Sequence, residues 1–376
     1  MLALLGIGVW RDRRQASGYG SFVAADRGMG GIVSAISAAA SSESAWVMLS
    51  LSGLGWKHGL GAYWAAAGCA SGFIFVSIFV VRQLQRSAAK QGCVVTLGDY
   101  FAARLCGDDP DKGRIIRSTY AIISTVFMVA YVVAQFTGAG KELAQMGMMP
   151  YKGGVVFGAI VVGLYVTTGG YEAVCWTDLV QGLLMLAVML GLPVVALVKA
   201  GGISPVMSSL KAAHIDKFWF GNGGPTLGFA LTYFGFVLGY PGIPHALIRY
   251  VTIRDQAQAK IASYVGAGYG VLLLFAAPTL GIICRALIPQ MADPEQLLPT
   301  FAGSFLPPMI GGIILAAVSA AMMSTADSQL MLAASTLVHD LWSESLNAKK
   351  KIDSKVLKKM TRLAIVALTG IAGLTA

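Results

Sequence analysis

Apolar stretches of about 20 residues or more recur along most of the chain, separated by polar connections. A helix that crosses a bilayer needs about 20 mainly apolar residues. Hydrophobic residues make up 56% of the sequence and charged residues only 12%, whereas soluble domains carry about 25% charged residues. The pattern predicts an all-α polytopic membrane protein, with spans expected at 29–55, 61–82, 113–146, 152–169, 173–199, 225–250, 257–289, 307–342 and from about 356 onward.

The net charge of +10 does not indicate a nucleic-acid partner, because the basic residues follow the predicted spans. All but seven of the 28 Lys and Arg residues fall in every second connection. The positive-inside rule places that basic set in the cytoplasm. The opposite connections hold only Lys57, Lys141, Lys152, Lys199, Lys211, Lys217 and Arg285.

Three carboxylates, Glu43, Asp178 and Asp327, lie within apolar stretches in which we place no Lys or Arg. A charge at that depth costs at least about 2.5–3.5 kcal/mol, and such residues usually mark an ion or solute path. The absence of a basic neighbour predicts that a mobile cation balances them. An alternative for Asp178 is that it caps its helix together with Thr177.

Two predicted spans are interrupted at corresponding positions. Span 29–55 contains Ser41, Ser42, Glu43 and Ser44 in succession, and span 225–250 contains Gly239 to Pro244, in which each proline removes a backbone donor. Broken helices five spans apart indicate a transporter built from inverted repeats. We expect a first repeat at 29–199 and a second at 225–376, with 1–10 a remnant of a preceding transmembrane helix and the chain truncated at both ends.

The eighth span carries Ser324, Thr325 and Ser328 near Asp327. Na⁺ is a hard cation and prefers several oxygen ligands. Hydroxyl groups that face an unwound helix supply such ligands. The alternative is that these hydroxyls bond back to carbonyls of their own helix; we favour that alternative for Ser328 alone and the ion for Ser324 with Thr325.

At this point the sequence resembles the sodium/solute symporter family, and within it the sodium/proline symporters. The resemblance runs in order along essentially the whole chain. It is carried by 37–46 (SAAASSESAW), 96–101 (TLGDYF), 176–178 (WTD), 239–245 (GYPGIPH) and 323–325 (MST).

The resemblance implies a leucine-transporter-like bundle of five plus five helices and two sets of ion ligands. The principal Na⁺ site would use the main chain of Ala40, Glu43 and Ala321 and the hydroxyls of Ser324 and Thr325. A second Na⁺ site, present in some members, aligns with Asp178, Ser324, Asp327 and Ser328. The solute would meet Phe236, Tyr240 and Pro244, and we add Ser42, Ser44, Trp46, Tyr131 and Gln135 as further candidates.

The chain departs from the proline transporters at three of these places. Ser42 stands where they carry Asp and the acid lies one place later, at Glu43; Phe236 replaces their Trp; and Asp327 replaces a small polar residue. These changes bear on solute specificity and on the number of coupled ions. The carboxyl groups of these two acids, Glu43 and Asp327, are also candidate proton-binding groups.

We therefore expect a Na⁺-coupled symporter that imports proline, another amino acid or a small carboxylate by alternating access. Its partners would be a small-molecule solute and the lipid bilayer, with no nucleic acid, and its location the bacterial cytoplasmic membrane. An H⁺-coupled symporter and a transporter-like sensor are the alternatives. The four His residues are isolated in sequence, so we expect no enzyme, no zinc site and no cofactor beyond Na⁺.

Overall fold

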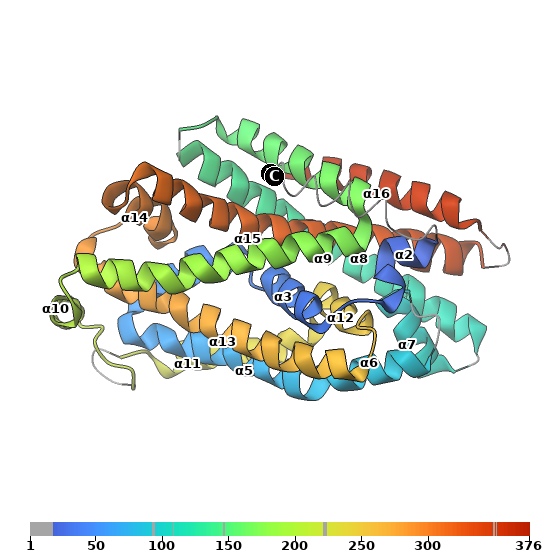
Figure 1. The fold of residues 1–376 in the computed structure, drawn as a ribbon, viewed down its shortest axis with the longest axis horizontal. Coiled ribbons are helices and arrows are strands. Elements are labelled where there is room, and N and C mark those ends of the chain that lie inside the picture. Colours follow the sequence, from blue (N-terminus) through green and yellow to red (C-terminus); the bar gives the residue numbers. More distant parts are fainter. Residues whose placement is uncertain are drawn as a thin grey trace.

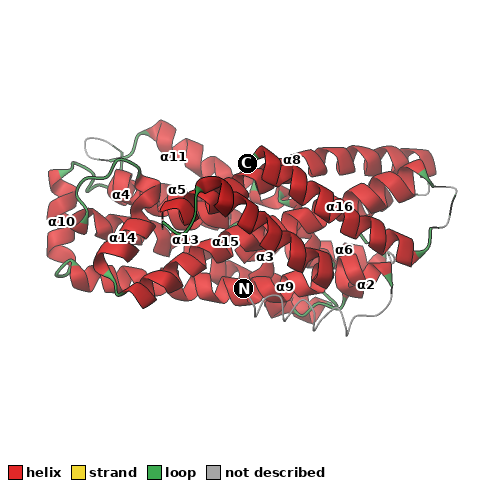
Figure 2. Cartoon of the chain, turned by 90° about the horizontal axis from the view of Figure 1, so that it is seen from above, coloured by secondary structure: helices red, strands yellow, loops and turns green. Residues whose placement is uncertain are grey.

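The computed structural model describes residues 18–91, 95–107, 109–145, 147–220, 224–348, 350 and 352–376, and within these ranges every regular element is a helix (Figures 1 and 2). The first half contains α2 (Tyr19–Ala24), η1 (Ala25–Arg27), α3 (Gly31–Ser42), η2 (Trp46–Leu51), α4 (Ser52–His58), η3 (Gly59–Ala62), α5 (Tyr63–Phe75), η4 (Val76–Val80), α6 (Val81–Lys90), α7 (Leu97–Cys106), α8 (Pro110–Gln145) and α9 (Tyr151–Lys199). The second half contains α10 (Ile203–Ala212), α11 (Leu227–Phe234), η5 (Gly235–Leu238), η6 (Tyr240–Gly242), α12 (Pro244–Val251), α13 (Gln256–Leu287), η7 (Pro294–Gln296), α14 (Leu297–Phe305), α15 (Pro308–Ser335), η8 (Thr336–Leu346) and α16 (Ser354–Thr375).

Among the described residues, five helical segments are long and apolar enough to cross a membrane, and a sixth span is a bent pair. Two of these segments join spans that the sequence predicts separately. The 49 residues of α9 would extend about 74 Å at 1.5 Å per residue, about 2.5 times the hydrocarbon thickness. Its only non-helical residue is Gly170, with φ of 62°, which marks the turn between the predicted spans 152–169 and 173–199.

Both predicted interruptions are present. Helix α3 ends at Ser42, and helical structure resumes only after Glu43, whose φ and ψ are −91° and 14°. The second broken span bends by 42° between Gly242 and Pro244. Here Ile243 is extended and Pro244 opens α12, because proline tolerates only the first turn of a helix.

The two broken spans lie side by side at the centre of the molecule, where α3 and α12 meet between the long helices α9, α13 and α15 (Figure 1). Small residues allow the closest approaches. A Cβ atom on Gly281 of α13 would lie 1.9 Å from the carbonyl oxygen of Ser52, and one on Gly55 would lie 2.2 Å from that of Pro278. Contacts of this kind let the backbones of α4 and α13 pack directly, as is common between membrane helices.

The predicted segment 1–10 lies outside the described residues, and the division into repeats at 29–199 and 225–376 stays a prediction. Large apolar side chains such as Phe127 and Val198 remain exposed on the long helices α8 and α9, which suits contact with lipid rather than water.

Candidate ion and solute sites

The hydroxyls of Ser324 and Thr325 reach across from α15 to the end of α3. Ser324 Oγ lies 3.2 Å from the carbonyl oxygen of Ala40 and 3.2 Å from that of Ala321. Thr325 Oγ1 lies 3.0 Å from the carbonyl oxygen of Ser41 and 3.0 Å from that of Ala321. Each hydroxyl has a single proton for two carbonyl oxygens, so the cluster offers more oxygen acceptors than donors.

The end of α3 explains why its carbonyls are free to point at α15. The last four carbonyl groups of a helix have no partner within that helix, and α3 stops at Ser42. The oxygen of Ser41 also contacts His245 Nε2 at 3.2 Å, whereas that of Ala38 is taken by the hydroxyl of Ser42. The end of α3 thus leaves main-chain carbonyl oxygens that face the hydroxyls of Ser324 and Thr325.

Glu43 is 1% exposed and points its side chain at the other broken span. Tyr240 donates its hydroxyl proton to Glu43 Oε1 over 3.1 Å, and Glu43 Oε2 has no partner within the described residues. No described Lys or Arg forms an ion pair with this carboxylate. The contact links the two broken helices directly.

The expectation that Asp178 lacks a basic neighbour is wrong. Arg249 of α12 reaches into the bundle, where its Nη2 atom lies 2.7 Å from Asp178 Oδ2, and the two side chains are 1% and 0% exposed. The guanidinium also donates to the hydroxyls of Ser37 and Ser328 and to the carbonyl of His245. Sequence reasoning places Arg249 in a cytoplasmic connection, but its side chain is buried and paired within the bundle, after the bend of the second broken span.

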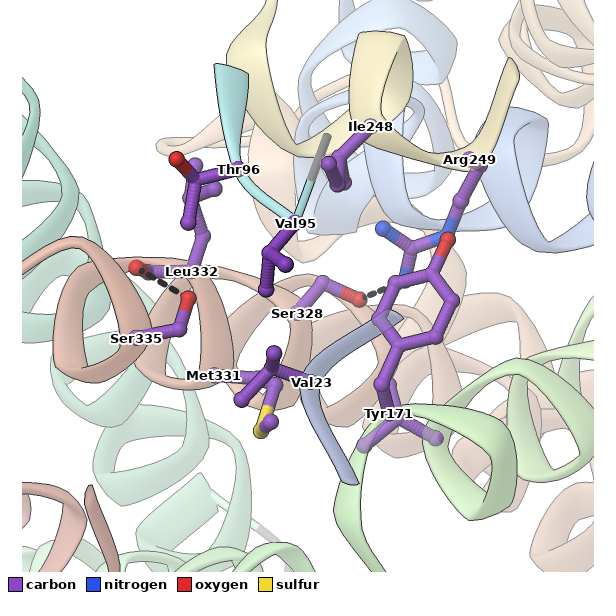
Figure 3. A pocket seen from close by; sticks show the side chains of 11 residues that line it. Val23, Val95, Thr96, Tyr171, Ile248, Arg249, Ser328, Met331, Leu332 and Ser335 are labelled. Atoms are coloured by element: carbon purple, nitrogen blue, oxygen red, sulfur yellow. Dashed lines mark hydrogen bonds between the residues drawn. The ribbon is translucent and has the colours of Figure 1, made fainter. Parts of the chain in front are cut away.

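The view of this region shows the Arg249 side chain descending from α12 towards Ser328, beside the ring of Tyr171 (Figure 3). The guanidinium carbon lies 5.9 Å from the centre of that ring. A cavity of about 10 Å³ adjoins them, lined also by Val95 and Thr96, which is room for about one water molecule.

The alternative that Asp178 caps a helix is also excluded by its position. Asp178 lies eight residues after Gly170 within α9, and the hydroxyl of Thr177 bonds back to the carbonyls of Ala173 and Val174. Instead, Ser37 donates to Asp178 Oδ2 over 2.6 Å. Asp178 Oδ1 has no partner within the described part of the chain.

Asp327 lies beside this pair and is fully buried. Tyr165 donates to its Oδ2 atom over 2.7 Å and Ser328 contacts its Oδ1 atom at 2.9 Å. Ser328 also bonds back to the carbonyl of Ser324 at 2.8 Å, as the sequence-based alternative expects, and lies 3.4 Å from Asp178. Ser328 therefore contacts both acids proposed for the second cation site, and Arg249 contacts Asp178 and Ser328.

The solute candidates fall into separate groups. Ser44 lies 3.1 Å from the hydroxyl of Tyr131, and the rings of Trp46 and Phe236 meet edge to face with centres 5.5 Å apart. With Tyr240 these residues line the junction of the broken spans. The other three candidates lie elsewhere. The Ser42 hydroxyl donates to a carbonyl of its own helix, Pro244 begins α12, and Gln135 lines a cavity between α8, α9 and α15.

One polar cluster was missed because its members are far apart in sequence. His339 Nε2 lies 2.9 Å from Asp99 Oδ2, and Arg117 Nε lies 3.0 Å from Asp99 Oδ1. Asp340 lies close enough to His339 and Asp99 for the three to share a metal ion, so His339 is not isolated. Burial opposes ionisation of Asp99, but the hydrogen bond and charge of His339 and the charge of Arg117 prevail and hold the pKa of Asp99 below its usual value.

Comparison with known proteins matches residues 22–376 to the sodium:solute symporter family. The sodium/proline symporter 2 of Staphylococcus saprophyticus is 31% identical over 377 residues, which cover 98% of this chain and 72% of that protein. A sodium/proline symporter of Staphylococcus aureus (strain USA300 / TCH1516) is 29% identical, with coverage of 99% and 72%.

Two solved structures share the fold. The substrate-bound, outward-open state of a Na⁺-coupled sialic acid symporter superposes with a TM-score of 0.84 at 19% identity and covers 99% of this chain and 79% of that one. A nucleobase–cation symport 1 family transporter in a closed conformation, with bromovinylhydantoin bound, gives 0.60 at 12% identity, with coverage of 94% and 74%. The helices therefore form the predicted leucine-transporter-like bundle, and the protein is an integral membrane transporter and not an enzyme. It belongs to the sodium:solute symporter family.

Proposed function

We propose that the protein couples the inward movement of Na⁺ to the import of a small polar solute, and that the ion binds where α3 ends against α15. The observation that carries this proposal is the position of Ser324 Oγ, 3.2 Å from the carbonyl oxygens of both Ala40 and Ala321. In this proposal Thr325 supplies a second hydroxyl, and Glu43 supplies a third main-chain carbonyl beside those of Ala40 and Ala321. Oxygen ligands from two helices suit a hard cation.

A site shared between two helices also explains coupling. Ala40 belongs to the broken span and Ser324 to the unbroken α15. A cation held by both favours the conformation in which the two helices are close, and an ion shifts an equilibrium only through such differential contacts. Loss of Na⁺ on the cytoplasmic side then releases the broken helix.

The solute is proposed to bind at the junction of the broken helices, against Trp46, Phe236, Tyr240, Tyr131 and Ser44. Aromatic faces and unwound backbone suit a small zwitterion or carboxylate, because half-helix ends bind its charged groups. The staphylococcal relatives are described as sodium/proline symporters, which makes proline the first solute to test. The departures at Ser42, Glu43 and Phe236 extend the panel to other amino acids and small carboxylates.

A second cation is proposed to bind between Asp327, Ser328 and the free Oδ1 atom of Asp178. Two ionised carboxylates and one guanidinium carry a net charge of −1, so one further cation, Na⁺ or H⁺, balances the buried cluster. Arg249 supplies the other positive charge. We place the protein in the bacterial cytoplasmic membrane.

The proposal is tested by radiolabelled uptake into proteoliposomes of the purified protein. Proline, other amino acids and small carboxylates are supplied with an inward Na⁺ gradient, an inward H⁺ gradient or neither. Uptake that requires the Na⁺ gradient supports the proposal. Uptake driven by the H⁺ gradient alone would mean that the coupling ion is H⁺ and not Na⁺. Binding of a solute without uptake would favour a sensor.

A further inference from the structure

A cavity of about 550 Å³ lies between α8, α9 and α15, away from the junction of the broken helices. Its wall is mostly apolar and includes Phe136, Val161, Leu184 and Met322. Volumes of about 300–1,000 Å³ are typical of small-molecule sites. Neither the Ser324 and Thr325 hydroxyls nor Tyr240 lines it.

This apolar cavity contains a buried acid that the proposed transport mechanism does not use. Glu142 of α8 is 4% exposed. Its Oε2 atom accepts a hydrogen bond from Ser319 over 3.1 Å. Among the described residues, Oε1 has no hydrogen-bond partner, and no Lys, Arg or His forms an ion pair with the carboxylate. A buried carboxylate without a partner is costly, so the position favours a ligand that supplies positive charge.

A second buried polar group lines the same cavity. Gln135 lies seven residues before Glu142 on the same face of α8 and is 6% exposed. Its Oε1 atom also has no partner within the described residues. Glu142 and Gln135 are therefore separated by two helical turns, about 10 Å, with apolar wall between them.

Two residues that line the cavity are partly exposed on a predicted membrane span. Phe157 and Val180 of α9 line it and are 42% and 48% exposed. Both lie within Tyr151–Lys199, a segment long and apolar enough to span the membrane, so we expect a route into the cavity from the lipid. A ligand that enters here must itself dissolve in the bilayer, which excludes small hydrophilic ions.

We propose that this cavity binds an apolar ammonium compound from the lipid phase, with Glu142 as its counter-ion. The N–H groups of the ammonium donate to Glu142 Oε1, and the apolar body fills the space beside Phe136 and Val161. The cavity lies between α8, which carries Tyr131, and α15, which carries Ser324. A ligand bound there contacts both helices and restrains their relative movement. It therefore slows transport without competing with Na⁺ or solute.

The probes are three molecules with one apolar frame: 4-phenylbutylammonium, 4-phenylbutanol and 4-phenylbutyrate. Binding is measured by isothermal titration to the full chain in phosphatidylcholine nanodiscs, with empty nanodiscs subtracted. The ammonium compound is expected to bind at least about tenfold more tightly than the alcohol, and the carboxylate not to bind, because only the cation pairs with a buried carboxylate. Equal affinity for ammonium and alcohol would overturn the proposal.

Two variants locate the binding. Glu142→Gln is expected to lower the affinity for the ammonium compound at least about tenfold and to leave that for the alcohol unchanged. Ala139→Phe, which fills the cavity and keeps the acid, is expected to remove binding of both. Glu295→Gln, at an acid outside the cavity, is the matched control, and solute uptake without probe reports folding. Undiminished ammonium binding to a folded Ala139→Phe protein would place the probe elsewhere and contradict the proposal.

Discussion

Arg249 and Asp178 form an ion pair in the centre of the bundle, with 2.7 Å between Nη2 and Oδ2 and neither side chain more than 1% exposed. One residue comes from the half-helix α12 and the other from the long helix α9. The pair thus ties a broken helix to an unbroken one. It also supplies from within the protein a positive charge that sequence reasoning attributes to a mobile ion.

The first prediction concerns the strength of this pair. Arg249→Gln leaves Asp178 buried without its partner, which costs about 3–5 kcal/mol, so its thermal midpoint in detergent should fall well below that of the wild type. The double variant with Asp178→Asn removes both charges and should recover part of the loss. Purely additive losses in the double-mutant cycle would mean that the two side chains do not interact.

A second prediction addresses the number of coupled cations. Asp327→Asn removes the negative charge that Arg249 leaves unbalanced, so the number of cations moved per solute should fall by one. Reversal potentials in reconstituted vesicles, at several Na⁺ and pH gradients, measure this ratio and identify the ion. An unaltered ratio together with an unaltered pH profile would remove the second cation site from the account.

The third prediction concerns the solute. Tyr240→Phe removes the hydrogen bond to Glu43 and a polar contact at the junction of the broken helices. The solute half-saturation concentration should rise about three- to tenfold, the range of one lost hydrogen bond, and more than that of Na⁺. Tyr264→Phe, at a tyrosine 64% exposed on α13, is the control. If only the Na⁺ half-saturation concentration changes, the solute binds elsewhere.

A fourth prediction follows from the close packing of α4 against α13. Gly281→Ala places a methyl group 1.9 Å from the carbonyl oxygen of Ser52. Overpacking of this kind costs about 1–3 kcal/mol or more, so the thermal midpoint should fall. Gly268→Ala, on the same helix with nothing within 4 Å, should change it little. Equal thermal midpoints for the two variants would show that α4 and α13 can move apart without loss of stability.

The sequence predicts the features that depend on local chemistry. The breaks at Glu43 and at Ile243 follow from a polar run and from closely spaced prolines, and the hydroxyls of Ser324 and Thr325 follow from their place in an apolar helix. Arg249 was not predicted as the partner of Asp178. It lies five residues after Pro244, and the sequence does not give the direction of the half-helix that follows this proline, so it does not show whether Arg249 reaches lipid, water or the core. Asp99 and His339 are 240 positions apart and meet only through tertiary packing.

The central claim is that Ser324 and Thr325 hold the coupling Na⁺ against the end of α3. The most direct measurement is the Na⁺ dependence of uptake by the double variant Ser324→Ala with Thr325→Ala, compared with wild type at equal amounts of protein in the vesicle membrane. Ser335→Ala with Thr336→Ala is the control, because these two hydroxyls bond back to the carbonyl of Leu332 on the same continuous helix. The account predicts that the Na⁺ half-saturation concentration rises at least about tenfold in the first pair, because two oxygen ligands are lost, and stays near wild type in the control. An unchanged Na⁺ half-saturation concentration in a folded Ser324→Ala, Thr325→Ala protein would contradict it.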